Sequence, residues 1–378
     1  MGRVEKTVTG PARVLLLGFG LFLSLAGFQA SAQVYPFRRF GPVDGLPHSF
    51  AYTVTQDDRG YLWIGTFGGL ARYDGERFLT ISTKDGLPGD DVRAILQDRQ
   101  GRLFVAADRG VARLERRASG ALHVGAVPPK VFGVAEGLPS PAARALVEDA
   151  EGAIWVATRD GGVARLGENG VALALRTGKE LPSSTAWCGA RDARGRLWFG
   201  TRGDGVFRLD GRTVVRFSLA EGLPDPNVFD LKVDPKGTLF AATTAGVARF
   251  DEEAKRFVFV PYGADASTAV SSLAFDASGT MWVGRYGRGV AKVTPSGTTI
   301  LREEQGLPSD FVTGLFVDRE GSLWITMQGG GLAQFASDRF AAYDRTAGWP
   351  GGAADAFALE PEGAVWAGSF GRGAVRID

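Results

Sequence analysis

The stretch that decides the fold, "DGLPHSFAYTVTQDDRGYLWIGTFGGLARYDG", begins at Asp44 and ends at Gly75. The chain repeats its wording: Asp85 begins "DGLPGDDVRAILQDRQGRLFVAADRGVARLE", and Glu221 begins "EGLPDPNVFDLKVDPKGTLFAATTAGVARFD". Self-similarity of this kind predicts small structural units that are stacked or arranged in a ring. The length of 378 residues is therefore a poor guide to the number of conventional domains.

The aromatic residue of "LWIG" marks the repeat, which has a period of about 42 residues. An acid and a glycine precede the marker in every unit, as Asp57 and Gly60 precede Trp63. The longest interval contains an insertion at 116–129. The marker positions of the eight units are Trp63, Phe104, Trp155, Trp198, Phe240, Trp282, Trp324 and Trp366.

Each unit reads as four short strands, which we call a, b, c and d. In the first unit, strand a ends just before Asp57, "LWIGT" is strand b, "GLARYD" is strand c and "RFLTIS" is strand d. Turns rich in acid and glycine join the strands tightly. These features predict an all-β fold, a β-propeller of four-stranded antiparallel blades with eight repeat units.

Two ways of closing the ring are compatible with the repeats, and we favour the first. The last unit ends in "GAVRID" without a strand d, whereas "YPFRRF" at 35–40 precedes the first unit as an isolated d-like strand. Pairing these two segments would close an eight-bladed ring and leave no open sheet edge. Alternatively, seven blades close by themselves and the eighth unit begins a second propeller.

Residues 1–32 have the pattern of a secretory signal peptide. Basic residues between Arg3 and Arg13 precede an apolar run at 14–28, and "ASA" predicts cleavage after Ala32. A transmembrane anchor is the alternative, but the run is shorter than the roughly 20 residues that a bilayer requires.

The signal peptide predicts a periplasmic or secreted protein. The β-propeller would then occupy 33–378, with an N-terminal closing strand at 34–40 and repeat units at 44–378.

Composition excludes several classes of site. Lys and Arg number 43 and Asp and Glu 42, so no basic excess predicts nucleic acid as a partner. Cys188 is the only cysteine, which excludes an internal disulfide, and it occupies a strand a position that other units fill with small residues. Neither His48 nor His123 belongs to a metal-binding or acid–base pattern. We therefore expect no cofactor, no metal and no catalytic residue.

The consensus "DGLPxxxVxxIxxDxxGxLWIGTxxGLxRYDGxxF" resembles the two-component regulator propeller repeat over nearly all of the mature chain. The resemblance is most complete at 44–78 and weakest at 262–267. It implies an exported sensory module of a transmembrane signalling system. In that family a membrane helix and an intracellular histidine kinase or cyclase commonly follow, so the resemblance implies association with a sensor kinase or cyclase output region that is not present in this chain.

The topology of a blade indicates where a ligand would bind. The d–a and b–c connections share one end of the ring, where the residues vary, and the repeated acid–glycine turns lie at the other end. Arginines beside aromatic rings suit oligosaccharides or anionic groups. The predicted ligand-binding residues are Tyr52, Phe67, Arg109, Arg144, Arg159, Trp187, Arg202, Phe229, Tyr286, Arg288, Gln328 and Phe370.

Three functions follow from this pattern. The first is a non-catalytic sensory module that binds a small molecule or an oligosaccharide. The second is a protein-interaction scaffold of the cell envelope, for which the insertion at 116–129 would be a docking loop. The third is a propeller hydrolase or lyase, which the absence of an evident acid–base pair disfavours.

Overall fold

The computed structural model describes residues 35–115, 128–176, 180–181, 185–211, 213–263, 265–335, 354–360, 365–369 and 373–377. The predicted signal peptide and most of the insertion at 116–129 lie outside the described residues. The chain forms two compact bodies, one made of Ala32–Asp344 and the other containing Arg345–Asp378.

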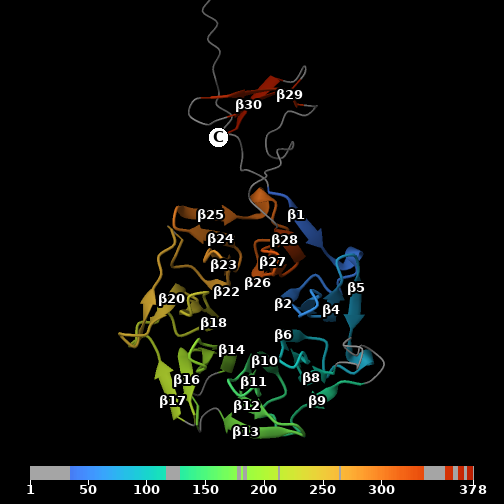
Figure 1. Ribbon diagram of the computed structural model, residues 1–378, viewed down its shortest axis with the longest axis vertical. Coiled ribbons are helices and arrows are strands. Elements are labelled where there is room, and N and C mark those ends of the chain that lie inside the picture. Colours follow the sequence, from blue (N-terminus) through green and yellow to red (C-terminus); the bar gives the residue numbers. More distant parts are fainter. Residues whose placement is uncertain are drawn as a thin grey trace, which may run out of the picture. The chain divides into compact units, whose positions relative to one another are not determined.

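The larger body is a ring of seven antiparallel sheets, each of four strands (Figure 1). Each sheet is one blade, and the blades are numbered 1 to 7 along the chain. Strands a surround the centre of the ring: β2 (Ala51–Gln56), β6 (Val92–Gln97), β10 (Ala143–Glu148), β14 (Thr185–Arg191), β18 (Val228–Val233), β22 (Val270–Phe275) and β26 (Val312–Val317). Strands b come next: β3 (Leu62–Thr66), β7 (Leu103–Ala107), β11 (Ile154–Thr158), β15 (Leu197–Arg202), β19 (Leu239–Thr243), β23 (Met281–Arg285) and β27 (Leu323–Met327).

The outer half of each blade holds strands c and d. Strands c are β4 (Gly69–Tyr73), β8 (Gly110–Leu114), β12 (Gly162–Leu166), β16 (Val206–Asp210), β20 (Gly246–Asp251), β24 (Gly289–Thr294) and β28 (Gly331–Phe335). Strands d are β5 (Phe78–Ile81), β9 (Lys130–Phe132), β13 (Val171–Arg176), β17 (Thr213–Phe217), β21 (Arg256–Phe259), β25 (Gly297–Leu301) and β1 (Phe37–Phe40). Short 3-10 turns lie at η1 (Pro42–Asp44), η2 (Thr83–Asp85) and η3 (Glu303–Gln305). The predicted propeller of four-stranded antiparallel blades is confirmed.

The predicted eight-bladed closure is wrong. The N-terminal strand β1 pairs with β28 of the seventh unit, with Phe40 opposite Leu332. The eighth unit instead forms a three-stranded sheet of β29 (Ala354–Leu359), β30 (Val365–Ser369) and β31 (Gly373–Ile377) in the smaller body. The alternative, in which seven blades close by themselves, matches this strand pairing.

Aromatic packing explains why β1 completes the seventh blade. The ring of Phe40 lies 5.8 Å from that of Trp324 in blade 7 and 5.1 Å from that of Tyr73 in blade 1. Across the same junction, the Thr313 hydroxyl donates a hydrogen bond to the carbonyl of Ala51 at 2.6 Å. The last blade is therefore joined to the first by both apolar and polar contacts, and the ring is closed.

The repeated acid holds the turn between strands a and b. Oδ1 of Asp57 accepts the backbone N–H of Tyr61 at 3.0 Å, while Oδ2 accepts the indole N–H of Trp63 at 2.9 Å. Asp192 and Trp198 repeat the indole bond at 2.7 Å. One carboxylate therefore fixes both the turn and the largest buried side chain of the blade, which explains why the acid and the tryptophan recur together.

Close approach of neighbouring blades explains the small residues near the axis. A Cβ atom added to Gly200 of β15 would lie 2.5 Å from the Cys188 sulfur and 2.7 Å from Val228 of the next blade. Cys188 is buried, and this burial raises the pKa of its thiol well above the ordinary value. The prediction that Cys188 serves packing is consistent with this environment.

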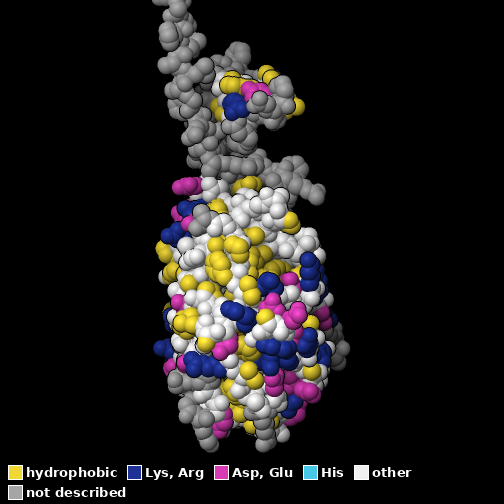
Figure 2. All heavy atoms as spheres, turned by 90° about the vertical axis from the view of Figure 1, so that its left-hand side faces the viewer, with side chains coloured by type: hydrophobic (Ala, Val, Ile, Leu, Met, Phe, Trp, Pro, Cys, Tyr) yellow, Lys and Arg dark blue, Asp and Glu magenta, His cyan; other side chains and the backbone are white. Residues whose placement is uncertain are grey.

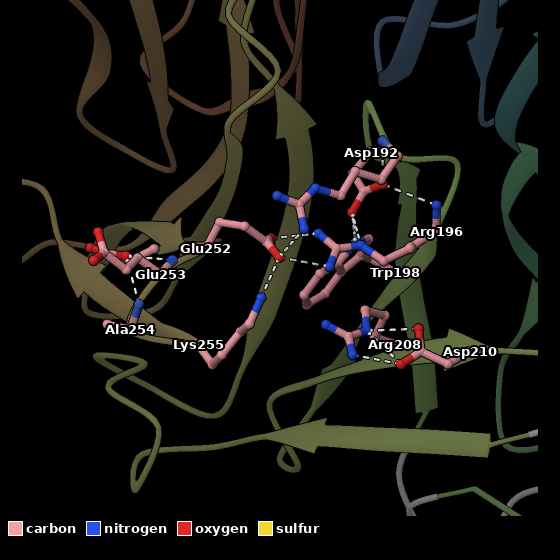
Figure 3. A network of polar contacts seen from close by, with 11 residues as sticks. Asp192, Arg196, Trp198, Arg208, Asp210, Glu252, Glu253, Ala254 and Lys255 are labelled. Carbon is pink, nitrogen blue, oxygen red and sulfur yellow. Dashed lines mark hydrogen bonds and ion pairs between the residues drawn. The ribbon is translucent and has the colours of Figure 1, made fainter.

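Ion pairs also join neighbouring blades at the end of the ring that carries the a–b turns (Figure 3). Nε of Arg196 lies 2.6 Å from Asp192 of its own blade 4, and its Nη2 lies 2.6 Å from Glu252 of blade 5. Arg194 and Lys255 each lie 2.6 Å from the same glutamate. These cations lower the pKa of Glu252 to about 2, and the hydrogen bond from Arg196 is the largest cause.

Phe40→Ala should destabilise the ring by about 3–5 kcal/mol, because it empties a buried aromatic site between the last and first blades. Leu79→Ala is the control, since Leu79 lies on strand d of blade 1 but is 41% exposed. Thermal melting measures the effect. Equal midpoints for the two variants would contradict the role of β1 in closure.

Glu252→Gln should lower the melting temperature at neutral pH by a few degrees, as the loss of a partly exposed ion pair worth up to about 1 kcal/mol would. The folded-state pKa is below the ordinary value of 4.5, so the carboxylate stabilises the fold above that pH. The difference between wild type and variant should shrink as the pH falls from 4.5 toward about 2.

Glu253→Gln is the control, because among the described residues Glu253 contributes only its backbone amide, which donates to Asp251. Glu253→Gln should have the same melting temperature as the wild type at every pH. A constant difference between wild type and Glu252→Gln at every pH would argue against the ion pair.

Candidate functional site

A β-bulge recurs near the start of every strand a in the ring. The pairing between β2 and β3 passes from Ala51 to Thr53 and skips Tyr52, and the same shift occurs in the other six blades. A bulge leaves its extra residue unpaired and re-aims the side chain. The skipped residues are Tyr52, Arg93, Arg144, Trp187, Phe229, Ser271 and Thr313.

These bulges lie at the end of the ring that carries the d–a loops and b–c hairpins. Backbone bonds join the two kinds of loop there: the amide of Phe67 donates to Phe50, and that of Arg159 donates to Ala142. The bulged side chains are all half-buried. Each blade therefore presents one partly accessible side chain at the same end, close to the centre of the ring.

Blades 1 to 5 place aromatic rings and guanidinium groups at this position, and Arg202 at the end of β15 in blade 4 adds one more guanidinium group. Arg93 lies over the ring of Tyr52, with its Cζ atom 3.7 Å from the ring centroid. The Cζ atoms of Arg144 and Arg202 lie 4.9 and 4.8 Å from the ring of Trp187. Arg202 also lies 5.7 Å from the ring of Phe229. We call these six residues the axial arc: Tyr52, Arg93, Arg144, Trp187, Arg202 and Phe229.

The axial arc holds like charges near one another. Arg93 forms an ion pair with Asp91 at 2.6 Å. Burial lowers the pKa of Arg144, and the charge of Arg93 acts in the same direction. Burial likewise raises the pKa of Tyr52 to about 12, with Arg93 opposing and Asp91 reinforcing the shift. The phenol therefore stays protonated at neutral pH and can donate a hydrogen bond.

The remaining two blades of the ring differ in chemistry. The Ser271 hydroxyl donates to the carbonyl of Val312 at 2.7 Å, and that of Thr313 donates to the carbonyl of Ala51. These small side chains are satisfied by the backbone of the next blade. At the bulge position, the aromatic and cationic side chains are therefore confined to blades 1 to 5.

The structure brings five predicted ligand-binding residues together in the axial arc: Tyr52, Arg144, Trp187, Arg202 and Phe229. A sixth, Arg159, is close enough for its charge to act on Arg144, and it pairs with Asp160 at 3.3 Å. Arg93 completes the arc, and the sequence signal for it is its position equivalent to Tyr52.

The other predicted residues belong to separate groups. The Tyr286 hydroxyl donates to Oε1 of Gln328, and its ring lies 5.1 Å from that of Phe311, which the sequence prediction missed. Phe67 contacts His48, with ring centroids 5.4 Å apart.

Three predicted residues remain. Arg109 is highly exposed and pairs with Asp108 at 3.8 Å. Arg288 lies 3.8 Å from Asp265. Phe370 lies outside the described residues.

Two grooves lie at the opposite end of the ring, between neighbouring blades. The larger, of about 370 Å³, is lined by Asp192, Arg196, Lys236 and Glu252, among others, and the smaller, of about 250 Å³, includes Arg102. The edge of the ring that includes β20 shows Lys and Arg interleaved with Asp and Glu (Figure 2). These grooves coincide with the ion pairs that join blades, so we attribute their charges to the scaffold.

The described residues contain neither a metal-binding cluster nor a helix that could span a membrane. Among them, no group of three or more His, Cys, Asp or Glu side chains is arranged to hold a metal ion. Within the same residues, no helix combines the length and apolarity needed to cross a bilayer.

Four of the repeats match a known protein family. The family of the two component regulator propeller matches residues 45–68, 86–109, 137–160 and 306–329. Histidine kinase P4 of Formosa agariphila is 39% identical over 69 residues, which are 18% of this chain and 5% of the kinase. The chain thus corresponds to a small part of that protein.

Solved structures of similar fold include the extracellular domain of a protein described as a hybrid two component system from B. thetaiotaomicron. Its TM-score is 0.72 at 19% identity, and the match covers 91% of this chain and 48% of that one. Virginiamycin B lyase from Staphylococcus aureus has a TM-score of 0.61 at 14% identity, covering 79% of this chain and 98% of the lyase. At these identities the likeness establishes the fold alone. Four of the repeats thus match the two component regulator propeller family, and the chain has a propeller fold.

Proposed function

We propose that this chain is a non-catalytic, exported sensory module of a two-component type system, and that it binds its ligand at the axial arc. The observation that carries the proposal is the set of three aromatic rings that blades 1 to 5 pair with guanidinium groups at one end of the ring. The matched repeats and the similarity to an extracellular domain of a hybrid two component system support the signalling context.

The ligand class follows from the chemistry of the arc. Faces of Trp187 and Phe229 offer apolar surfaces on which a sugar ring can stack. Arg144 and Arg202 have no carboxylate within ion-pair distance among the described residues, so they remain available for an acidic group. We therefore propose an oligosaccharide or an anionic small molecule as the ligand.

The protonation state of the arc favours binding over catalysis. A phenol with a pKa of about 12 is a poor nucleophile or base at neutral pH, which disfavours Tyr52 in those roles. The carboxylate of Asp91 is held in its pair with Arg93. The signal would then pass to a membrane sensor kinase or cyclase, which is the class of partner that the resemblance implies.

Trp187→Ala and Arg202→Ala should each weaken ligand binding by at least about tenfold, because each removes a stacking surface or a charged donor from the arc. A thermal-shift screen over glycans and organic acids identifies a ligand, and calorimetry then measures the affinity of each variant. Arg319→Ala is the control, because Arg319 is an exposed residue of an a–b turn at the opposite end. Unchanged affinity in the first two variants would contradict this site.

The chain should show no turnover of fluorogenic glycosides. Tyr52→Phe provides the internal check, since it removes the phenol while retaining the ring that Arg93 covers. Turnover by the wild type that disappears in Tyr52→Phe would overturn the non-catalytic proposal.

A further inference from the structure

Blade 6 departs from the others at the end of strand b. In four blades this position is a threonine whose hydroxyl donates to a glycine carbonyl of the following hairpin at 2.8 Å. The four are Thr66, Thr158, Thr201 and Thr243. In blade 6 the equivalent residue is Arg285, the last residue of β23. A large cation here replaces a small scaffold residue, so packing alone does not explain it.

The guanidinium group of Arg285 is buried and incompletely bonded. Its side chain is 0% exposed. Nη2 donates to the carbonyl of Arg288 at 2.7 Å, whereas Nε has no acceptor among the residues that the structure describes. Burial lowers the pKa of Arg285, and the charges of Arg302 and Arg288 act in the same direction. A buried cation in this state requires compensation from an anion.

The available carboxylate is shared among three cations. Asp265 lies 3.4 Å from Arg285, 3.8 Å from Arg288 and 3.7 Å from Arg302. These distances exceed the 2.6 Å between Arg196 and Glu252. The three guanidinium groups thus share one carboxylate, and Nη1 of Arg285 donates to it a long hydrogen bond of 3.4 Å. We call these four residues the arginine cluster: Asp265, Arg285, Arg288 and Arg302.

The carboxylates of Asp310, Glu303 and Glu304 also lie near Arg302, but none of them forms an ion pair with it among the described residues. Asp310 is close enough for its charge to act on Arg302, but its Oδ1 accepts the backbone amide of Glu303 at 3.0 Å. Arg302 also has a buried Nε atom without an acceptor among the described residues. Arg288 and Asp265 are 50% and 41% exposed, so the cluster is open to solvent on their side.

We propose that the arginine cluster is a binding site for a tetrahedral oxyanion, such as a sulfate group. One carboxylate offers two oxygens to three guanidinium forks, whereas a tetrahedral oxyanion offers four. The anion would be free in solution or a substituent of a larger ligand. The cluster lies on blade 6 and the loops beside it, and it shares no residue with the axial arc, so this inference is independent of the proposed function.

The test measures thermal melting of the chain with zero to about 20 mM sodium sulfate, with sodium chloride holding the ionic strength constant. Wild type should show a saturable rise in midpoint, because the anion binds the folded state. Arg285→Thr, which restores the threonine of four other blades, should reduce the apparent affinity at least about tenfold. The matched control is Arg77→Thr, which removes one charge from a side chain that is 84% exposed and should behave like wild type.

A second variant tests the same site in the opposite direction. Asp265→Asn removes the carboxylate that competes for the three guanidinium groups, so it should bind sulfate more tightly than wild type. Arg319→Ala, which changes an exposed residue of an a–b turn at the opposite end of the ring, should retain the wild-type response. If Arg285→Thr does not fold, Arg285→Lys is the substitute variant. It keeps the positive charge but lacks the forked guanidinium group, so it should still weaken sulfate binding.

Two ligands distinguish the sources of the anion. Glucose 6-sulfate, with glucose as the blank, tests whether the cluster accepts a sulfate that is carried on a sugar. A saturable response to inorganic sulfate alone would assign the site to a free anion, and a response to both would assign it to a substituent as well. General stabilisation by salt exclusion does not saturate and is common to all variants. Identical responses of wild type and Arg285→Thr, or weaker binding by Asp265→Asn, would overturn the proposal.

Discussion

The hydrogen bonds that the acid of each a–b turn accepts from the backbone amides of that turn are the interaction on which the blades depend, and in four blades of the ring the same acid also accepts a tryptophan indole. In blade 1 the carboxylate of Asp57 accepts both this indole and the turn amides. It thereby fixes the position of the aromatic side chain before the next blade packs against it. Because the turn amides are held in this way in all seven blades of the ring, the blades share one turn geometry, and the opposite end of the ring is free to vary in sequence.

The sequence predicted the strands of the ring because their signals are local. The acid, the glycine and the tryptophan lie within one turn and one strand, and together they are specific enough to define each unit. The contacts that decide how the ring closes have no local signal in the sequence. Closure depended on whether Phe40 packs between Trp324 and Tyr73, a contact between residues distant in the chain that no repeat pattern encodes.

The candidate site was predictable only in part, for a similar reason. Five of the six residues of the axial arc were predicted, because positions on strand a and in the b–c hairpin follow from the repeat. The distances between rings and guanidinium groups depend on the bulges, which a repeat alignment does not show. Arg285 was missed although its signal was present, since it stands where other blades carry threonine.

The pairing of β1 with β28 means that the ring is sealed by hydrogen bonds and not by the covalent chain. Both chain ends of the ring enter the same sheet, so detachment of either end begins in blade 7. The rate at which the entire ring unfolds should then depend on how stably β1 is bound in blade 7. A mechanical load applied to the two ends would act on that one junction before it reached any other blade.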